Sequence, residues 1–361
     1  MKKKILYVTE AFAGGIFTYL VDLSNELVES FDICIAYSKR PQTPNNFKDY
    51  FDSRIQFVKI EHFTREINPL QDLQAMGEIK HIVKTFKPDI VHLNSSKAGV
   101  LGRLGINERK IKVFYTPHGY SFLMQNTSKL KRSAYWLIEK AASLNKSVSI
   151  SCSKGEYEVS KSINRRARWV NNGVNMEKLD RIPLAHVKML NDSEKVRLCT
   201  IGRISSQKNP NLFNEIAEAF PSYEFLWIGD GEQKDELTSS NIKVTGWVSR
   251  GKALEFANRS DIFILTSLWE GLPMSLLEAM YLQKPCVVSN VVGNRDVIQD
   301  SKNGFVCPDL NSFVSRIKLL CNNPVISKKI VDRAKTDIRV EYNTKNMAHK
   351  YRKIYEESIV S

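Results

Sequence analysis

Short apolar runs rich in β-branched residues recur along this chain and alternate with longer segments of helical spacing. In the first half, strands are expected at Ile5–Val8, Ile33–Ala36, Gln56–Ile60, Ile90–Leu93, Val113–Tyr115 and Val148–Ser151. Helices are expected between them, near residues 16–29, 70–87, 97–105, 131–144 and 153–162. Few of these strands alternate apolar with polar residues, so helices should cover both faces of their sheet. The pattern predicts a parallel sheet with crossover helices.

The pattern restarts in the second half, after a loop-like segment at residues 183–193. Strands are expected there at Arg197–Ile201, Glu224–Ile228, Ile242–Val244, Ile262–Leu265 and Cys286–Ser289. A length of 361 residues also suits two domains of ordinary size. We predict an α/β chain of two doubly wound, Rossmann-like domains, at residues 1–175 and 176–342, and a helix at residues 343–361. In such sheets ligands bind at the carboxyl ends of the strands, so the loops there should carry the chemistry.

Positive charge is concentrated in the first half of the chain. The net charge is +14, and residues 101–170 hold 14 lysines and arginines against four glutamates, a local net charge of +10. Much of this excess comes from Lys129, Lys131, Arg132, Lys140, Lys146, Arg165, Arg166 and Arg168. A basic surface attracts nucleic acid, anionic lipid or phosphorylated ligands without choosing among them. A face that only keeps the protein in solution is an equal alternative.

Composition and apolar run lengths restrict the environment of the chain. Hydrophobic residues at 42% and charged residues at 25% are typical of folded globular proteins. The apolar run at Ile5–Val8 is too short for a signal peptide, and no stretch is long enough to span a membrane, so any membrane contact should be peripheral. The six cysteines form no CxxC pair, which suits reduced thiols in a cytosolic protein without a zinc site.

Residues 270–278, Glu-Gly-Leu-Pro-Met-Ser-Leu-Leu-Glu, follow an expected strand and open an expected helix. Pro273 suits the first helical turn, which places Glu270 in the preceding loop and Glu278 inside the helix. The backbone amides around Leu272–Ser275 then form an anion site at the positive end of the helix dipole. This segment can hold phosphate and sugar hydroxyls; the alternative for Glu278 is a solvated helix residue.

Two cations occupy the loop that follows the first strand of the second half. Arg203 offers a planar fork of N–H donors, and Lys208 offers a mobile point charge. Such a pair is suited to clamping a diphosphate. The alternative is that both are ordinary exposed loop cations.

The first half contains two weaker candidates. Gly15 belongs to a Gly-Gly pair between a strand and a helix, where a backbone can approach a ligand closely. The pair is not GxGxxG, so a simple tight turn is the alternative. His118 follows an expected strand and lies between Pro117 and Gly119, at the ligand-binding edge of the sheet. A structural histidine is the alternative there.

Together these segments resemble glycosyltransferase family 4, the retaining, nucleotide-sugar-dependent enzymes of the GT-B fold. The likeness runs through residues 3–6, 87–99, 172–175, 203–208, 246–248 and 270–278, and so covers nearly the whole chain. Residues 95–99 and 117–122 are most similar to bacterial members that build capsule, exopolysaccharide or O-antigen units. The resemblance implies an acceptor-binding first domain, a nucleotide-sugar-binding second domain, a central cleft between them, and a C-terminal helix that crosses back to the first domain.

The resemblance also implies a role for each candidate residue. Glu270 would lie near the reacting carbon of the transferred sugar and His118 would contact the donor sugar, so these two are the catalytic candidates. The donor-binding set is Gly15, Arg203, Lys208, Trp247, Val248, Leu272, Pro273, Met274, Ser275 and Glu278. Two positions depart from the family pattern: Asn175 replaces a frequent Asp, and Val292 replaces a frequent Gly. The second departure leaves the identity of the donor sugar open.

The chain contains no Asp-x-Asp, the carboxylate pair that usually bridges Mg²⁺ to a sugar diphosphate. Fixed cations and helix amides must then neutralise the leaving diphosphate, so neither a metal nor a cofactor is expected. The expected reaction moves a sugar, most simply from UDP, to a lipid-diphosphate-linked saccharide at the cytoplasmic, anionic face of the membrane. The alternatives are a UDP-sugar 2-epimerase of the same architecture and a basic nucleic-acid-binding protein. Against the last, no nucleic-acid-binding motif is found.

Overall fold

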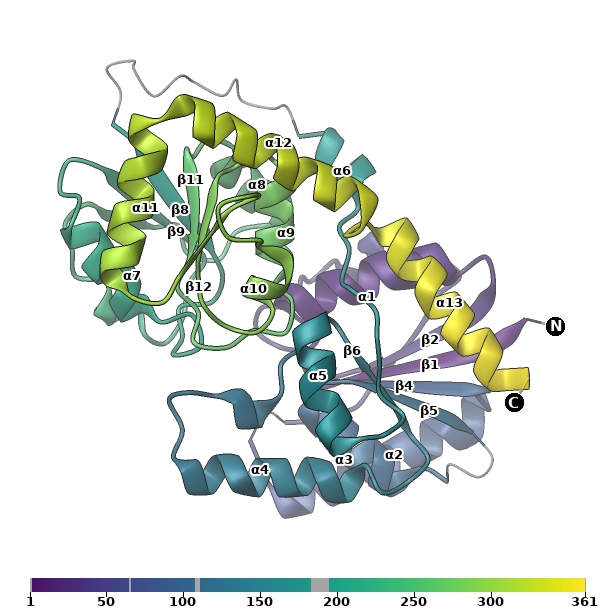
Figure 1. Cartoon of the computed structure of the whole chain (residues 1–361). Coiled ribbons are helices and arrows are strands. Elements are labelled where there is room, and N and C mark those ends of the chain that lie inside the picture. Colours follow the sequence, from purple (N-terminus) through teal and green to yellow (C-terminus); the bar gives the residue numbers. More distant parts are fainter. Residues whose placement is uncertain (1, 65, 108–110, 183–194, 361) are drawn as a thin grey trace. The chain divides into compact units, whose positions relative to one another are not determined.

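The computed structural model describes residues 2–64, 66–107, 111–182 and 195–360 (Figure 1). Contacts within the chain divide it into two units. Unit 1 contains Met1–Asn172 and Thr344–Ser361, and unit 2 contains Gly173–Asn343. The sequence predicts divisions after residues 175 and 342. The loop expected at residues 183–193 lies outside the described residues.

Unit 1 is built on a parallel sheet of seven strands, ordered β3-β2-β1-β4-β5-β6-β7. The strands are β1 Lys3–Thr9, β2 Phe31–Tyr37, β3 Gln56–Lys59, β4 Ile90–Asn94, β5 Lys112–Thr116, β6 Val148–Ser151 and β7 Arg168–Trp169. The first six agree with the predicted runs to within two residues at each end. Strand β7 is not predicted, because two residues at a sheet edge carry no periodicity.

Six α-helices and two short 3-10 helices belong to the described part of unit 1. They are α1 Gly14–Leu27, η1 Phe47–Tyr50, α2 Pro69–Phe86, α3 Ser96–Gly105, η2 Ser121–Leu123, α4 Lys129–Ala142, α5 Lys154–Ile163 and α13 Thr344–Val360. Local chemistry sets their ends. At α2, the Asn68 side chain accepts the backbone N–H of Gln71 and Pro69 occupies the first position, while Lys87 ends the helix with a left-handed φ of 53°.

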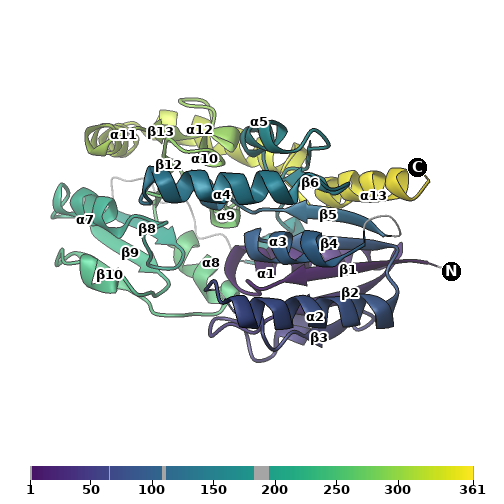
Figure 2. The ribbon, with the colours of Figure 1, turned by 90° about the horizontal axis from the view of Figure 1, so that it is seen from below.

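Alternate residues of β1 enter two separate hydrophobic cores. Ile5 and Tyr7 pack in the core that α1 and α13 complete, and Leu6 and Val8 pack in the core that α2 and α3 complete. Helices α2 and α3 lie against β2, β4 and β5 (Figure 2). A run of four buried apolar residues requires cover on both faces of a sheet, so the predicted layer order is confirmed.

The C-terminal helix α13 packs on α1 within unit 1 (Figure 1). Its buried residues Met347, Tyr351 and Tyr355 recur at the three- and four-residue spacing seen in the sequence. The Tyr355 hydroxyl lies 2.6 Å from Nδ1 of His92, which is buried on β4. The last segment of the chain therefore completes the core that the first segment begins.

Unit 2 is built on a second parallel sheet of six strands, ordered β10-β9-β8-β11-β12-β13. The strands are β8 Arg197–Ile201, β9 Glu224–Ile228, β10 Ile242–Val244, β11 Ile262–Leu265, β12 Cys286–Ser289 and β13 Phe305–Cys307. The helices are α6 Met176–Asp180, α7 Pro210–Glu218, η3 Lys234–Glu236, α8 Arg250–Asn258, α9 Met274–Tyr281, α10 Asn294–Val297, α11 Leu310–Asn322 and α12 Pro324–Val340. The first five strands have the predicted bounds, and only the short edge strand β13 is missed. Two doubly wound α/β sheets are thus confirmed.

Candidate functional site

The loops at the carboxyl edge of the unit 2 sheet contain most of the predicted donor-binding residues. The loop after β11 leads into α9, and Pro273 is the N-cap of this helix rather than a member of its first turn. Leu272, Pro273 and Met274 are buried, and Ser275 is partly buried. The first N–H groups of an α-helix have no acceptor within the helix, so the start of α9 offers backbone donors to an anion.

The two glutamates of this segment are both buried. Glu278 is not a solvated helix residue, because its carboxylate is ion-paired with Arg250 of α8 and is nearly inaccessible. The Arg250 side chain is about one third exposed (35%), so the ion pair opens to solvent on the arginine side. The sequence analysis missed Arg250, which follows the candidate Val248 by two residues.

An ion pair joins the two loops that the sequence singled out in unit 2. The Lys208 ammonium lies 2.6 Å from Oε1 of Glu270, and both side chains are largely buried. The Ser267 hydroxyl donates to the same oxygen at 2.7 Å. The Thr266 hydroxyl donates to the backbone carbonyl of Lys208 at 2.7 Å, which fixes the backbone below the ammonium. The fold therefore holds a cation and a carboxylate in contact at the edge where α9 begins.

Arg203 has a looser environment than Lys208. Its guanidinium lies 2.8 Å from Glu232, and both side chains are substantially exposed. An exposed ion pair contributes no more than about 1 kcal/mol, so a diphosphate can compete with Glu232 for this guanidinium. Arg203 is thus available to a ligand at little cost, while Lys208 is already fixed in position.

The loop that carries Arg203 is shaped by the glycines after β9. A side chain at Gly229 or Gly231 would collide with the backbone of Gly202 or Ile204, and the Trp227 indole N–H donates to the Gly202 carbonyl at 2.8 Å. These two loops can approach so closely only because glycine stands at both positions. The Gly-Asp-Gly sequence directly after a strand is the signal that could have identified this contact.

The loop after β10 presents an aromatic ring at the same edge. Trp247 is half exposed and Val248 is partly buried, and they directly precede the Ser249 cap of α8. After β12, Gly293 has a φ of 87° and packs against Gly271 and Glu270. The carboxyl edge of this one sheet therefore gathers an aromatic surface, three cations, two buried carboxylates and a helix N-terminus.

His118 and Gly15 belong to unit 1. Gly15 is exposed in the first turn of α1. His118 has a left-handed φ of 54°, and its Nε2 lies 3.1 Å from Oδ1 of Asn94. An amide oxygen only accepts hydrogen bonds, so Nε2 carries the proton and Nδ1 keeps its lone pair. Burial lowers the pKa of His118 from 6.5 to about 3, so the ring is neutral near pH 7.

Glu156 of α5 holds the backbone beside His118. Its buried carboxylate accepts the backbone N–H of Gly119 at 2.7 Å and that of Cys152 at 2.8 Å. The Tyr19 ring packs edge-on against the imidazole, with the ring centres 4.6 Å apart. Glu156 and Asn94 were missed because no local pattern marks a residue whose partner lies on another element. The histidine is therefore fixed as a neutral group with one acceptor nitrogen.

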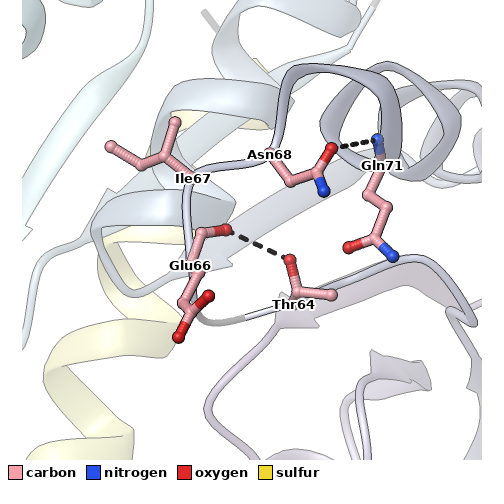
Figure 3. A pocket seen from close by; sticks show the side chains of 5 residues that line it. All are labelled: Thr64, Glu66, Ile67, Asn68 and Gln71. Carbon is pink, nitrogen blue, oxygen red and sulfur yellow. Dashed lines mark hydrogen bonds between the residues drawn. The ribbon is translucent and has the colours of Figure 1, made fainter.

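Two surface hollows lie away from these residues. One, of about 300 Å³ in unit 1, is lined by Thr64, Glu66, Ile67, Asn68 and Gln71 at the start of α2 (Figure 3). The other, of about 500 Å³, surrounds Pro308 and Arg316 in unit 2. Neither hollow is lined by a predicted site residue. Within residues 2–64, 66–107, 111–182 and 195–360, no group of three or more His, Cys, Asp or Glu side chains is arranged to hold a metal ion.

Each half of the chain matches a known glycosyltransferase family model. Residues 13–178 match the family model described as Glycosyltransferase Family 4, and residues 183–337 match the model described as Glycosyl transferases group 1. The chain is 29% identical to UDP-Gal:alpha-D-GlcNAc-diphosphoundecaprenol alpha-1,3-galactosyltransferase of Escherichia coli, over 83% of this chain and 82% of the relative. It is 28% identical to the O-antigen biosynthesis glycosyltransferase WbnH of Escherichia coli, over 83% and 84% of the two chains.

Solved structures share the whole fold at low sequence identity. Sucrose-phosphate synthase from Thermosynechococcus elongatus has a TM-score of 0.84 at 16% identity, and covers 99% of this chain and 100% of its own. The Anabaena protein HepE, solved in complex with UDP and glucose, has a TM-score of 0.78 at 14% identity, over 98% and 100% of the two chains. No helix among the described residues is long and apolar enough to cross a bilayer.

Proposed function

Because this chain belongs to the glycosyltransferases of family 4 with the GT-B fold, we propose that it moves a sugar from a nucleotide donor to a lipid-diphosphate-linked saccharide, with retention of configuration. The donor is UDP-linked in this proposal, since one relative is named for UDP-Gal and a structural neighbour was solved with UDP. The same relative is named for a diphosphoundecaprenol-linked acceptor. The product is an intermediate of a bacterial surface polysaccharide.

One observation carries the donor assignment: the buried Lys208–Glu270 pair at the edge where α9 begins. Lys208, Arg203 and the first amides of α9 are the groups that would bind the diphosphate. Glu270 lies beside Lys208 and would face the sugar carbon that reacts. Glu278 would bind the ribose hydroxyls, and the backbone around Trp247 and Val248 would meet the base. The family resemblance implies these roles, and the cations are suited by their chemistry to binding a diphosphate.

The proposed reaction exchanges one bond at the anomeric carbon of the donor. The bond from this carbon to the phosphate oxygen breaks, and a bond to the acceptor hydroxyl oxygen forms on the same face. The acceptor proton moves to the departing diphosphate, so no protein side chain is required as a nucleophile. Lys208 and Arg203 stabilise the negative charge that develops on the diphosphate, which is the largest electrostatic change in the step.

The lipid-linked acceptor also sets the place of reaction in this proposal. The enzyme works from the cytoplasm and is held peripherally on the inner face of the cell membrane. The basic surface of residues 101–170 supports this assignment, because an anionic leaflet attracts clustered lysines and arginines. Its partners are the nucleotide sugar, the lipid-linked saccharide and the anionic lipid surface, and no nucleic acid is among them.

We expect transfer to survive EDTA and to yield an α-linkage from an α-linked donor. The reason is that fixed cations, rather than a carboxylate-bound metal, neutralise the leaving group. The measurement is product formation from a panel of nucleotide sugars and a synthetic lipid-diphosphate saccharide, with EDTA and with added Mg²⁺, followed by NMR of the anomeric proton. A parallel reaction with donor alone is the control for epimerase activity. An inverted product, or loss of activity that Mg²⁺ restores, would contradict the proposal.

We expect His118→Ala to lower turnover much more than nucleotide affinity. A neutral Nδ1 acceptor that orients the sugar contributes chiefly in the transition state, so kcat should fall while the donor KM changes little. Because its pKa lies near 3, wild-type turnover should show no His118 inflection near the ordinary value of 6.5. Steady-state kinetics at pH values on both sides of 6.5 tests both expectations. His81→Ala, at an exposed position on α2, is the matched control. Unchanged turnover in His118→Ala would leave the histidine a structural role.

A further inference from the structure

The outward face of α4 in unit 1 is apolar along its whole length. Leu130 is 83% exposed, Leu137 is 60% exposed, and Leu144, just after the helix, is 80% exposed. With about 100° of rotation per residue, these positions fall on one side of the helix. The complete α4 apolar stripe consists of Leu130, Ala134, Leu137, Ile138, Ala141 and Leu144, all of them exposed. A solvated helix normally places charged residues on this side.

The opposite face of α4 is fixed to the core, so the helix cannot turn to bury the stripe. Glu139 is buried and its carboxylate lies 2.6 Å from the Arg103 guanidinium of α3. The Tyr115 hydroxyl of β5 donates to the same carboxylate at 2.7 Å. Tyr135 and Trp136 pack against the core beneath α2 and α3. Core packing is the usual role of apolar residues at helical spacing, and Tyr135 and Trp136 have this role. Leu130 and Leu137 do not, because Glu139 and the two aromatic residues already occupy the inner face.

Lysines border the stripe on both sides. By helical position, Lys129 lies beyond one edge and Lys131 beyond the other, and both are exposed. Lys146 is exposed two residues after Leu144. The only acidic residue between residues 111 and 147 is Glu139, which is buried and paired. The stripe is therefore an aliphatic surface in a positive field.

This composition distinguishes between the surfaces that could cover the stripe. Protein interfaces are enriched in aromatic residues, Met and Arg and are depleted in Lys. Helices that lie in a membrane interface combine an apolar face, rich in Leu, Phe and Trp, with Lys and Arg on the polar side. The α4 apolar stripe has leucine, isoleucine and alanine with lysine borders, which is the second pattern.

We infer that α4 lies flat in the surface of an anionic bilayer, with its leucines among the upper acyl carbons and its lysines at the lipid phosphates. The inference rests on the proposed function only for the purpose of membrane binding, which is to bring unit 1 to a lipid-linked acceptor. Membrane binding itself depends on α4 and the basic surface around it, and not on the donor site. The two can therefore be tested separately.

The test is co-sedimentation of the full chain with vesicles of phosphatidylcholine alone and of phosphatidylcholine with phosphatidylglycerol, at low and high salt. Leu130→Gln with Leu137→Gln should weaken binding at least about tenfold at both salt concentrations, because apolar insertion is not screened. Lys129→Gln with Lys131→Gln should weaken binding to the anionic vesicles at low salt only. Leu70→Gln with Leu73→Gln is the matched control, since these leucines are exposed on α2 in the same unit, and it should bind as the wild type does.

Several outcomes would overturn the inference. One is wild-type binding to neither kind of vesicle, and another is equal binding by the Leu130 and Leu137 variant. A third is a wild-type dimer in sedimentation velocity that this variant dissociates, since a second copy of the chain would then cover the stripe. Transfer to a water-soluble acceptor with only a short chain should be unchanged in the Leu130 and Leu137 variant. If the wild type binds vesicles yet transfers no sugar, the proposed function fails while the α4 inference stands.

Discussion

Replacing Lys208 by alanine should reduce sugar transfer by about 10²- to 10³-fold, the loss typical when one fixed donor to a developing oxyanion is removed. The ammonium is held 2.6 Å from Glu270, so it is already in position when the leaving diphosphate gains charge. Removal of this group also leaves the buried Glu270 carboxylate without its cation, although the Ser267 hydroxyl still donates to it, so some loss of stability should accompany the loss of transfer.

Glu278→Ala should act on donor binding instead. The loss of hydrogen bonds to a charged group costs about 1.5–3 kcal/mol, which weakens donor binding roughly 10- to 150-fold. The measurement for both variants is kcat and donor KM at a temperature where circular dichroism shows each to be folded. Lys243→Ala, a change of the same charge at an exposed position on β10, is the matched control and should transfer normally. Full activity in Lys208→Ala or Glu278→Ala would remove that residue from the donor site.

Glu139→Ala should cause the largest loss of stability of any single change considered. The Arg103 and Glu139 side chains are almost completely buried, and a 2.6 Å contact joins them. Removing one partner of a buried ion pair leaves an uncompensated charge and costs about 3–5 kcal/mol. For a folding unit of the size of unit 1, such a loss lowers the melting temperature by roughly 10 °C. Differential scanning calorimetry is the measurement.

Two further variants make this expectation specific. Glu158→Ala removes an exposed carboxylate that pairs with Lys161, and it should cost less than about 1 kcal/mol. Arg103→Met combined with Glu139→Leu replaces the buried pair by apolar side chains of similar size and should recover much of the stability. A melting temperature for Glu139→Ala equal to that of Glu158→Ala would mean that water reaches the pair in solution.

Local patterns in the sequence determined the elements and the class of fold. The uninterrupted apolar run of β1 requires cover on both faces of a sheet, whatever the rest of the chain does. The edge strands β7 and β13, with two and three residues, offer too short a pattern and were missed, although β10, also three residues long, was recognised. The turn chemistry around Pro273 likewise predicted a helix start after a strand, because proline and the free first amides act within a few residues.

Contacts across the fold decided the state of each functional group. Lys208 and Glu270 are 62 residues apart, and Arg250 and Glu278 come from different helices, so no spacing rule could pair them. Spacing is equally insufficient for α4, which has apolar residues on both faces. Its periodicity cannot tell which face meets the core. That choice depends on Arg103 of α3 and Tyr115 of β5, which hold Glu139 inward and leave the leucines outside. Periodicity is a property of neighbouring residues, whereas burial and ion pairing depend on residues that only the tertiary structure brings together.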